Sequence, residues 1–300
     1  MPTDRTYRLT EVLRHDGAIL NLATATRQLT RGRAPFQAAE GGGSKVITYP
    51  TLAKWKAAAI KAACSPEAQS DADHTRILCW TNGNVKALNR IVRERVYGIN
   101  AQPFMPGERI ISHDAIPDPA GGSPLVHSTT EMVIRSVVSD GGNLPGDELE
   151  AVAIASHGIR KFKAGEKIAA PWTFWTITAY APAVGTVEFN VLDANDLPRW
   201  KKCRNALADL AKTTKGRGDH RRYWRTYFNR KDAFGQVEPA AALTIHKSQG
   251  STYRHVFLHP DVDGFNANPA PIHNRLAYVG VTRAAETLHV VADQEVGRDD

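Results

Sequence analysis

Two segments of the printed sequence carry residue types that bind phosphate groups. The first, Ala242–Tyr253, is an apolar run that passes into His-Lys-Ser-Gln and then into a Gly-Ser-Thr turn. Small hydroxyl side chains and a glycine let backbone N–H groups approach an oxyanion closely. The second, Tyr278–Ala284, places Arg283 directly after another apolar run. A guanidinium presents a fixed fork of donors that fits phosphate, so the two segments indicate a phosphate-bearing ligand.

These segments resemble motifs V and VI of superfamily 1 helicases, most closely the RecD/Dda branch. By this resemblance, Arg283 matches the motif VI arginine that contacts the γ-phosphate of ATP. Gln249 and Gly250 match the part of motif V near the nucleotide cleft. The resemblance places the other motif V candidates near the DNA backbone: Thr244, His246, Lys247, Ser251 and Thr252. Thr252 stands where many UvrD-type members have glutamate, a departure that fits the RecD/Dda branch.

Two further segments extend the resemblance. Leu9–Arg14, followed by a helical apolar pattern, is similar to motif IV, which makes Arg14 a second candidate for the γ-phosphate. The alternative is a solvated arginine at a helix start. Arg76–Asn82 resembles motif IVa, a strand followed by Thr-Asn and a helix, so Thr81 and Asn82 are candidates for a DNA phosphate. Both residues also suit a helix cap, and the N–H groups of a cap bind anions themselves.

The phosphate loop of a complete nucleotide motor is missing from the sequence. Gly-x-x-x-x-Gly-Lys-Ser/Thr does not occur, nor does any Gly-Lys dipeptide. That loop holds the β- and γ-phosphates. Gly41–Lys45 has the residues in a different order, and we interpret it as a connector. A strand that ends in an Asp-Glu pair for magnesium is also absent. We therefore expect the second motor domain of a helicase, with ATP and magnesium bound only in a composite site shared with an N-terminal half, in cis or in trans.

The pattern of expected secondary structure changes along the sequence. Residues 1–103 and 236–300 alternate helical and strand patterns, which predicts an α/β domain with a parallel sheet, RecA-like by the resemblance. Residues 104–195 carry short strand-like runs split by Gly, Pro and Asp, which predicts an inserted small β-barrel. Residues 196–235 read as a basic, aromatic helical connector. Within it, Arg221–Phe228 interleaves arginines with rings, a pattern that suits either stacking on single-stranded bases or packing against the motor domain.

Local patterns predict the individual elements. Helices are expected over Ala18–Leu29, over Leu52–Ala63 and after Thr81. The expected strands are Lys45–Tyr49, Arg76–Trp80, Arg109–Ile111, Glu131–Val138, Leu149–Ala155, Trp172–Thr178, Thr186–Leu192, Ala241–Ile245, His255–His259 and Leu288–Ala292.

The amino-acid composition indicates which binding partners and which cellular compartment to expect. Lysine and arginine number 38 against 31 acidic residues, a formal charge of +7 that favours a polyanionic partner. Cys64, Cys79 and Cys203 lie far apart without metal-ligand spacing, so we expect free thiols in a reducing compartment and no metal site. No apolar run approaches the length of a membrane span. We expect a cytosolic protein that binds single-stranded DNA and no membrane.

Two classes of function follow from the resemblance. The first is ATP-driven translocation and unwinding of DNA in an intact motor, to which this chain contributes arginines and DNA-binding loops. The second is a non-catalytic DNA-binding or regulatory module descended from a helicase. An acid–base role for His246 and Lys247 is disfavoured, because no nucleophile or carboxylate lies in the local pattern.

Overall fold

The computed structural model describes residues 16–29, 33–118, 121–144, 171–216, 218–265 and 270–293. The chain divides into two compact units. Unit 1 comprises residues 1–100 and 241–300, and unit 2 comprises residues 101–240. The expected strand Leu149–Ala155 and the motif IV segment Leu9–Arg14 lie outside the described residues.

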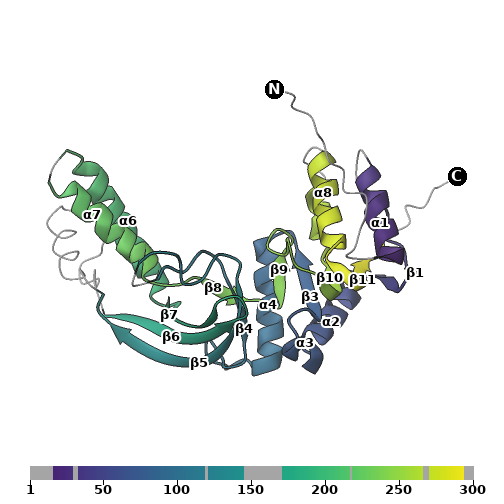
Figure 1. The fold of residues 1–300 in the computed structure, drawn as a ribbon, viewed down its shortest axis with the longest axis horizontal. Coiled ribbons are helices and arrows are strands. Elements are labelled where there is room, and N and C mark those ends of the chain that lie inside the picture. The colour runs from purple at the N-terminus through teal and green to yellow at the C-terminus, as the bar shows by residue number, and fades with distance from the viewer. Residues whose placement is uncertain are drawn as a thin grey trace. The chain divides into compact units, whose positions relative to one another are not determined.

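Unit 1 is built on a six-stranded sheet with the order β1-β2-β11-β10-β3-β9 (Figure 1). Its strands are β1 (Ala39–Gly41), β2 (Ser44–Tyr49), β3 (Thr75–Cys79), β9 (Ala242–Thr244), β10 (Tyr253–Leu258) and β11 (Ala284–Val291). All neighbours pair in parallel except the antiparallel hairpin β1–β2. Every residue of β3 and β9 is buried, as expected of a parallel sheet covered on both faces. The prediction of an α/β domain with a parallel sheet is confirmed.

The helices of unit 1 pack in pairs. They are α1 (Gly17–Gln28), α2 (Leu52–Ala63), the short α3 (Pro66–Ser70), α4 (Asn82–Tyr97), the 3₁₀ helix η1 (Pro260–Phe265) and α8 (Ala270–Val281). Helix α1 packs against α8, and α2 packs against α4. Trp55 of α2 and Leu88 of α4 share one buried cluster with Ile77 of β3 and Phe257 of β10. This cluster fixes α4 against the strands whose ends carry the candidate site.

A glycine allows α8 to lie close to the sheet. A Cβ added at Gly280 would stand 2.8 Å from Leu258 Cδ1 and 3.4 Å from Ile245 Cδ1. Because Leu258 and Ile245 are buried, any side chain here must displace core atoms. The glycine in the Val-Gly-Val run therefore sets the distance between α8 and the sheet.

Arg33 ties three distant segments of unit 1 together. Its guanidinium donates to the Asp263 carboxylate at 2.6 and 2.7 Å and to the Asp293 carboxylate at 2.6 and 3.0 Å. Asp293 also accepts the N–H of Phe36 at 2.7 Å. Residues separated by as many as 260 positions are thus joined by charge-assisted hydrogen bonds.

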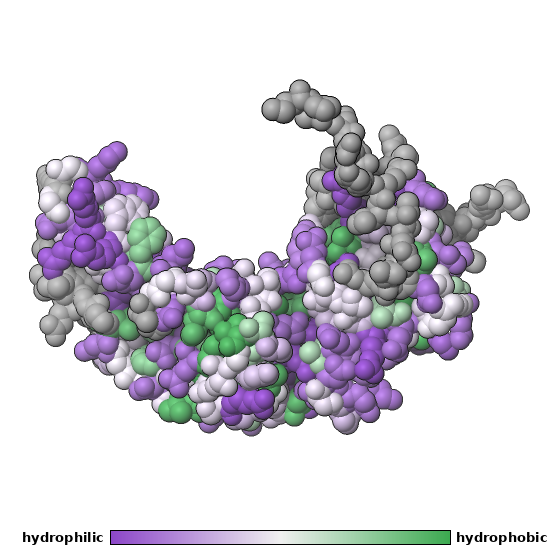
Figure 2. Space-filling view, viewed as in Figure 1, coloured by the Kyte–Doolittle hydropathy of each residue, from purple (hydrophilic) through white to green (hydrophobic). Residues whose placement is uncertain are grey.

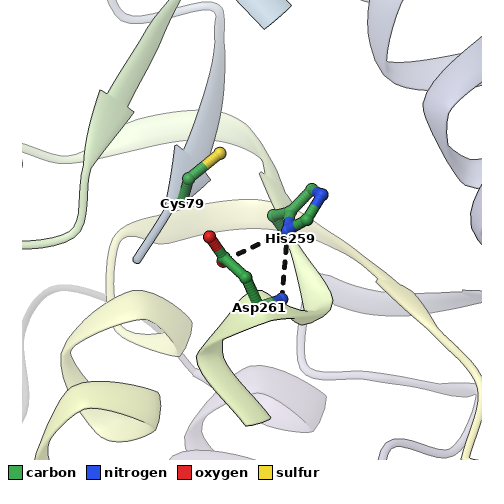
Figure 3. A group of neighbouring side chains, drawn as sticks. All are labelled: Cys79, His259 and Asp261. Atoms are coloured by element: carbon green, nitrogen blue, oxygen red, sulfur yellow. Dashed lines mark hydrogen bonds and ion pairs between the residues drawn. The ribbon is translucent and has the colours of Figure 1, made fainter. Parts of the chain in front are cut away.

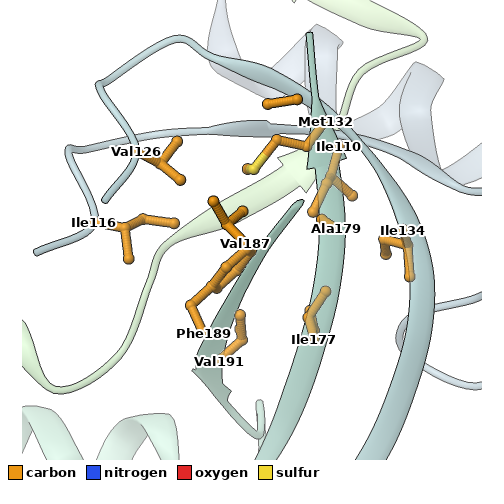
Figure 4. Close-up of a cluster of buried hydrophobic side chains, with 11 residues drawn as sticks. Ile110, Ile116, Val126, Met132, Ile134, Ile177, Ala179, Val187, Phe189 and Val191 are labelled. Atoms are coloured by element: carbon orange, nitrogen blue, oxygen red, sulfur yellow. The ribbon is translucent and has the colours of Figure 1, made fainter. Parts of the chain in front are cut away.

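Unit 2 contains a five-stranded antiparallel sheet with the order β7-β6-β5-β4-β8. Its strands are β4 (Arg109–Ser112), β5 (Glu131–Gly142), β6 (Trp172–Ala181), β7 (Gly185–Leu192) and β8 (Val237–Pro239). Figure 4 shows its apolar core, in which Ile110, Met132, Ile177 and Phe189 come from four different strands. One backbone hydrogen bond of 2.8 Å, from Gly235 N–H to the Asn190 carbonyl, links the segment before β8 to β7 at the opposite edge.

The basic segment of unit 2 forms two packed helices, α6 (Leu197–Thr213) and α7 (His220–Asp232). The aromatic rings of Trp172, Trp200 and Phe234 pack together at their base. Arg230 of α7 is buried, and its guanidinium carbon lies 5.4 Å from the centre of the Trp200 ring. Within the described residues, no helix has both the length and the hydropathy to span a membrane.

Candidate functional site

The loops that carry motifs IVa and V leave the sheet at the same edge. Strand β3 lies between β9 and β10 and is parallel to both, so the carboxyl ends of all three strands are neighbours. Main-chain hydrogen bonds extend the pairing one residue beyond the ends of β9 and β10. The Ile245 N–H donates to the Cys79 carbonyl at 2.9 Å, and the His259 N–H donates to the Leu78 carbonyl at 2.8 Å. In open α/β sheets, ligands bind outside the carboxyl ends of the strands. This edge is therefore the candidate site.

The motif V loop is held in shape by its own hydrogen bonds. Thr244 accepts the N–H of Lys247 on its hydroxyl at 3.3 Å and the N–H of Ser248 on its carbonyl at 3.2 Å. The Ser248 hydroxyl is fully buried and donates to the Ile245 carbonyl at 2.7 Å. Gly250 adopts φ +95°, which a residue with a side chain adopts only with strain. Thr244 is itself buried, so it shapes the loop from below.

The outward side of this loop presents the groups that can meet a ligand. His246, Gln249 and Gly250 are exposed, whereas Lys247, Ser251 and Thr252 are partly buried. The His246 and Trp80 rings lie 5.3 Å apart, centre to centre. A cavity of about 220 Å³ opens beside them, lined by Trp80, Ile245, His246, Gln249, Arg275, Leu276 and Val279. A ring pair, an amide and an arginine around a small cavity can bind a polar, anionic group.

Arg283 is buried behind the motif V loop, only 7% exposed. Its Nε donates to the Val279 carbonyl at 3.1 Å, which closes the last turn of α8. Its Nη1 donates to the Ser251 carbonyl at 3.0 Å, and its Nη2 donates to the Thr282 hydroxyl at 3.1 Å. The structure thus joins motif VI to motif V through this guanidinium, with its donors directed into unit 1.

Thr81 caps α4, and a carboxylate from another loop completes the cap. The Thr81 hydroxyl accepts the N–H of Asn84 and donates to Asp261 at 3.0 Å. The Asp261 carboxylate also accepts the main-chain N–H groups of Trp80 at 2.9 Å and Thr81 at 3.0 Å, and the Asn84 amide at 2.8 Å. Asp261 therefore occupies the anion-binding end of α4, the place that the sequence analysis assigns to a DNA phosphate.

Burial alone raises the pKa of the Asp261 carboxyl, but the hydrogen bonds from His259, Asn84, Trp80 and Thr81 outweigh it and lower the pKa to about 2. The carboxylate is therefore ionised at neutral pH and strengthens each of these bonds.

Within the described residues, Cys79, His259 and Asp261 form a group of side chains with the composition of a metal site (Figure 3). Their ligand atoms lie within 4.8 Å of one another. Nevertheless, the Asp261 oxygens already accept the hydrogen bonds of the α4 cap. Burial raises the pKa of the Cys79 thiol well above its usual range, and a protonated thiol is a poor ligand. The hydrogen bonds of the cap account for this arrangement.

Sequence reasoning missed three members of this edge. Trp80 follows β3 directly, Asp261 follows β10 by three residues, and Arg275 lies on α8 two turns before Arg283. An aspartate just beyond a strand was a readable signal, but its partner Thr81 is 180 positions away. Of the predicted residues, those of motifs IVa and V gather at this edge, Arg283 lies behind it, and Arg14 lies outside the described residues.

Comparison with known proteins identifies a matching protein family and two homologous helicases. Residues 239–291 match the UvrD-like helicase C-terminal domain family. The chain is 42% identical over 59 residues to the RecBCD enzyme subunit RecD of Haemophilus influenzae, covering 20% of this chain and 9% of RecD. It is 23% identical over 282 residues to the ATP-dependent DNA helicase Dda of Enterobacteria phage T4, covering 92% of this chain and 59% of Dda. The chain thus spans less than two thirds of the length of either relative.

Solved structures of low sequence identity also align along the chain. Pif1 helicase from Bacteroides, in complex with ADP-AlF3 and ssDNA, aligns over 95% of this chain and 52% of its own, with 11% identity and a TM-score of 0.40. Pif1 helicase from Candida albicans aligns over 95% and 56%, with 14% identity and a TM-score of 0.31. The sequence relatives carry the assignment: residues 239–291 match the UvrD-like helicase C-terminal domain family, and the chain is homologous to Dda and RecD, which supports its assignment to the C-terminal half of a superfamily 1 helicase.

Proposed function

We propose that this chain acts as the second motor domain of an ATP-dependent DNA helicase. The observation that carries the proposal is the gathering of motifs IVa and V at one edge of the parallel sheet, where His246, Gln249 and Gly250 are exposed beside a cavity of about 220 Å³. In this proposal, the loop binds the DNA backbone without reading its sequence, because hydroxyl and N–H groups suit phosphate. The DNA contacts are His246, Lys247, Ser251, Thr252 and Asn82, with Thr244 and Thr81 shaping their loops.

A partner domain supplies the phosphate loop and the magnesium carboxylate in this proposal, in cis or in trans. Arg283 and Arg14 then contact the γ-phosphate, and Gln249 and Gly250 line the nucleotide side of the cleft. For Arg283 this requires a rearrangement, because its donors are bound to Val279, Ser251 and Thr282. Exchange of a neutral carbonyl for a phosphate oxygen favours the change, since hydrogen bonds between ionised partners are stronger.

We further propose that the sheet of unit 2 closes into a small barrel through residues 235–239. Gly235 bonds β7 at Asn190, while β8 pairs with β4. The same short segment therefore contacts both edges of the sheet, which is how a barrel removes exposed strand edges.

The experiment fuses or adds a domain that carries Gly-Lys-Thr to the full chain and measures ATP hydrolysis with and without oligo-dT. We expect no turnover by the chain alone and DNA-stimulated turnover with the partner. Arg283→Ala is expected to reduce turnover by about 10³-fold, the effect of an arginine finger in related systems. Arg283→Lys keeps the charge without the planar fork and is expected to restore little. Full turnover in Arg283→Ala, with the complex assembled, would contradict the finger.

Ser251→Ala separates DNA binding from the contact with Arg283. The bond to Arg283 uses the Ser251 main-chain carbonyl, which the substitution keeps. Loss of DNA stimulation with unchanged basal turnover therefore isolates the hydroxyl. The second candidate function is a non-catalytic DNA-binding module, and the burial of Arg283 favours it. DNA binding that persists while no partner domain ever restores turnover would establish this second function.

A further inference from the structure

The net positive charge of the chain is concentrated in the two helices of unit 2. Residues 196–235 hold 12 of the 38 lysines and arginines but only four of the 31 acidic residues, a formal charge of +8. The other 260 residues hold 26 basic and 27 acidic residues, a formal charge of −1. Figure 2 shows many of the described residues in the region of α6 and α7 (Figure 1) in purple, the colour of hydrophilic residues, with white and green residues among them. A polyanion is therefore attracted to this hairpin more than to the rest of the chain.

Aromatic rings lie among these charges on α7. Trp224 and Phe228, one turn apart, stack with ring centres 5.8 Å apart and an angle of 28° between their planes. Tyr227 packs edge-on against both rings, at 5.4 and 5.3 Å. Phe228 is 50% exposed, so one ring of this cluster is open to solvent. A large exposed ring supported from behind by two others is a platform for another flat ring.

Charge and ring share one side of the helix. Arg221, Arg225 and Phe228 are all exposed, at spacings of four and three residues, which place them on one face of α7. The opposite face is anchored, because Arg230 is buried against the Trp172 and Trp200 rings. His220 also bonds the Ala211 carbonyl at 2.7 Å and so fixes the start of α7 to the end of α6. The exposed face is therefore held in place before any ligand arrives.

We infer that the exposed face of α7 is a second binding site for single-stranded DNA, in which Phe228 stacks on a base while Arg221 and Arg225 contact flanking phosphates. Stacking on aromatic side chains together with arginine contacts to the backbone is the general mode of sequence-independent single-strand binding. In a duplex, the faces of the bases are stacked on one another and cannot stack on Phe228. A duplex would therefore bind this site only through contacts between its phosphates and the arginines. The inference rests on the proposed function only in its choice of DNA as the polyanion.

The test measures binding of the full chain to fluorescein-labelled dT20 and to a labelled 20-base-pair duplex by fluorescence anisotropy at several salt concentrations. Phe228→Ala is expected to weaken binding to dT20 about tenfold, the value of one stacked base, and to leave duplex binding nearly unchanged. Phe228→Leu keeps an apolar side chain of similar bulk without the ring face, so it is expected to match the alanine variant. Because Phe228 is exposed, both variants are expected to fold.

Charge is tested separately. Replacing Arg221 and Arg225 with glutamine removes two phosphate contacts, so the slope of log affinity against log salt is expected to shrink by about 1.4. The matched control replaces the exposed Lys54 and Lys61 of α2 with glutamine, which removes the same charge from unit 1 and is expected to keep the slope.

The outcomes separate this inference from the proposed function. If the α7 variants bind dT20 like the wild type, the inference is wrong, and a protein surface is the better occupant of this face. An equal loss of duplex and single-strand affinity in Phe228→Ala also overturns it, because stacking would then play no part. If Ser251→Ala leaves binding intact while the α7 variants weaken it, the inference stands and the motif V proposal fails.

Discussion

Arg283 and the motif V loop are joined in both directions. The Arg283 guanidinium donates to the Ser251 carbonyl at 3.0 Å, and the main-chain N–H of Tyr253 donates to the Arg283 carbonyl at 2.8 Å. A shift of the loop at Ser251 would therefore disturb the arginine, and withdrawal of the guanidinium would remove one of the bonds that hold the loop. This pair of bonds is a direct physical route by which DNA binding can be coupled to nucleotide chemistry, provided that both sites have the proposed ligands.

The first prediction concerns the stability that Arg283 contributes. Arg283→Ala removes three hydrogen bonds from a nearly buried cation and leaves the Val279 and Ser251 carbonyls without this donor. We expect the free energy of unfolding to fall by about 2 kcal/mol. Urea unfolding followed by circular dichroism measures it. Arg283→Lys keeps one donor and the charge and should lose less; a fully stable alanine variant would show that these bonds matter little in solution.

The second prediction concerns pH. The folded pKa of Asp261, about 2, lies below its ordinary value of 3.8, so its ionised form stabilises the fold above about pH 4. This contribution, about 2 kcal/mol at neutral pH, is lost as the pH falls from about 4 to 2. Asp261→Asn keeps the shape without the titration. The difference in unfolding free energy between wild type and variant should therefore shrink over this window; a difference that does not change with pH would contradict the assignment.

The local elements of unit 1 could be predicted because each reflects residues close in sequence. The expected helix Leu52–Ala63 matches α2, and Thr81 caps α4 as its type and position indicate. Contacts between distant segments could not be predicted in this way. The Arg33 bonds to Asp263 and Asp293 span 230 and 260 positions, and the Asp261 cap depends on which strands become neighbours. Spacing alone also gave no sign that the Arg283 donors turn inward.

The third prediction separates the two roles of motif IVa. The Thr81 hydroxyl and N–H both bond Asp261, so Thr81→Ala is expected to cost about 1 kcal/mol of stability, the value of a helix cap, with little effect on DNA affinity. Thr81→Ser keeps the hydroxyl and should remain close to the wild type. The exposed Asn82 is the better candidate for a phosphate contact, so Asn82→Ala should weaken dT20 binding without loss of stability. Thermal unfolding and anisotropy together decide; a loss of affinity in Thr81→Ala at unchanged stability would reverse the two roles.

The fourth prediction tests the close packing of α8. Gly280→Ala adds a Cβ that would stand 2.8 Å from Leu258 Cδ1, although alanine is intrinsically favoured over glycine within a helix. Because Leu258 is buried, we expect overpacking to prevail and the unfolding free energy to fall by about 1–2 kcal/mol. A double-mutant cycle gives the control. Leu258→Ala alone leaves a cavity, but in the double variant the added methyl group meets no leucine, so the combined loss should be smaller than the sum of the two single losses. Additive losses would show that α8 accommodates the methyl group by shifting away from the sheet.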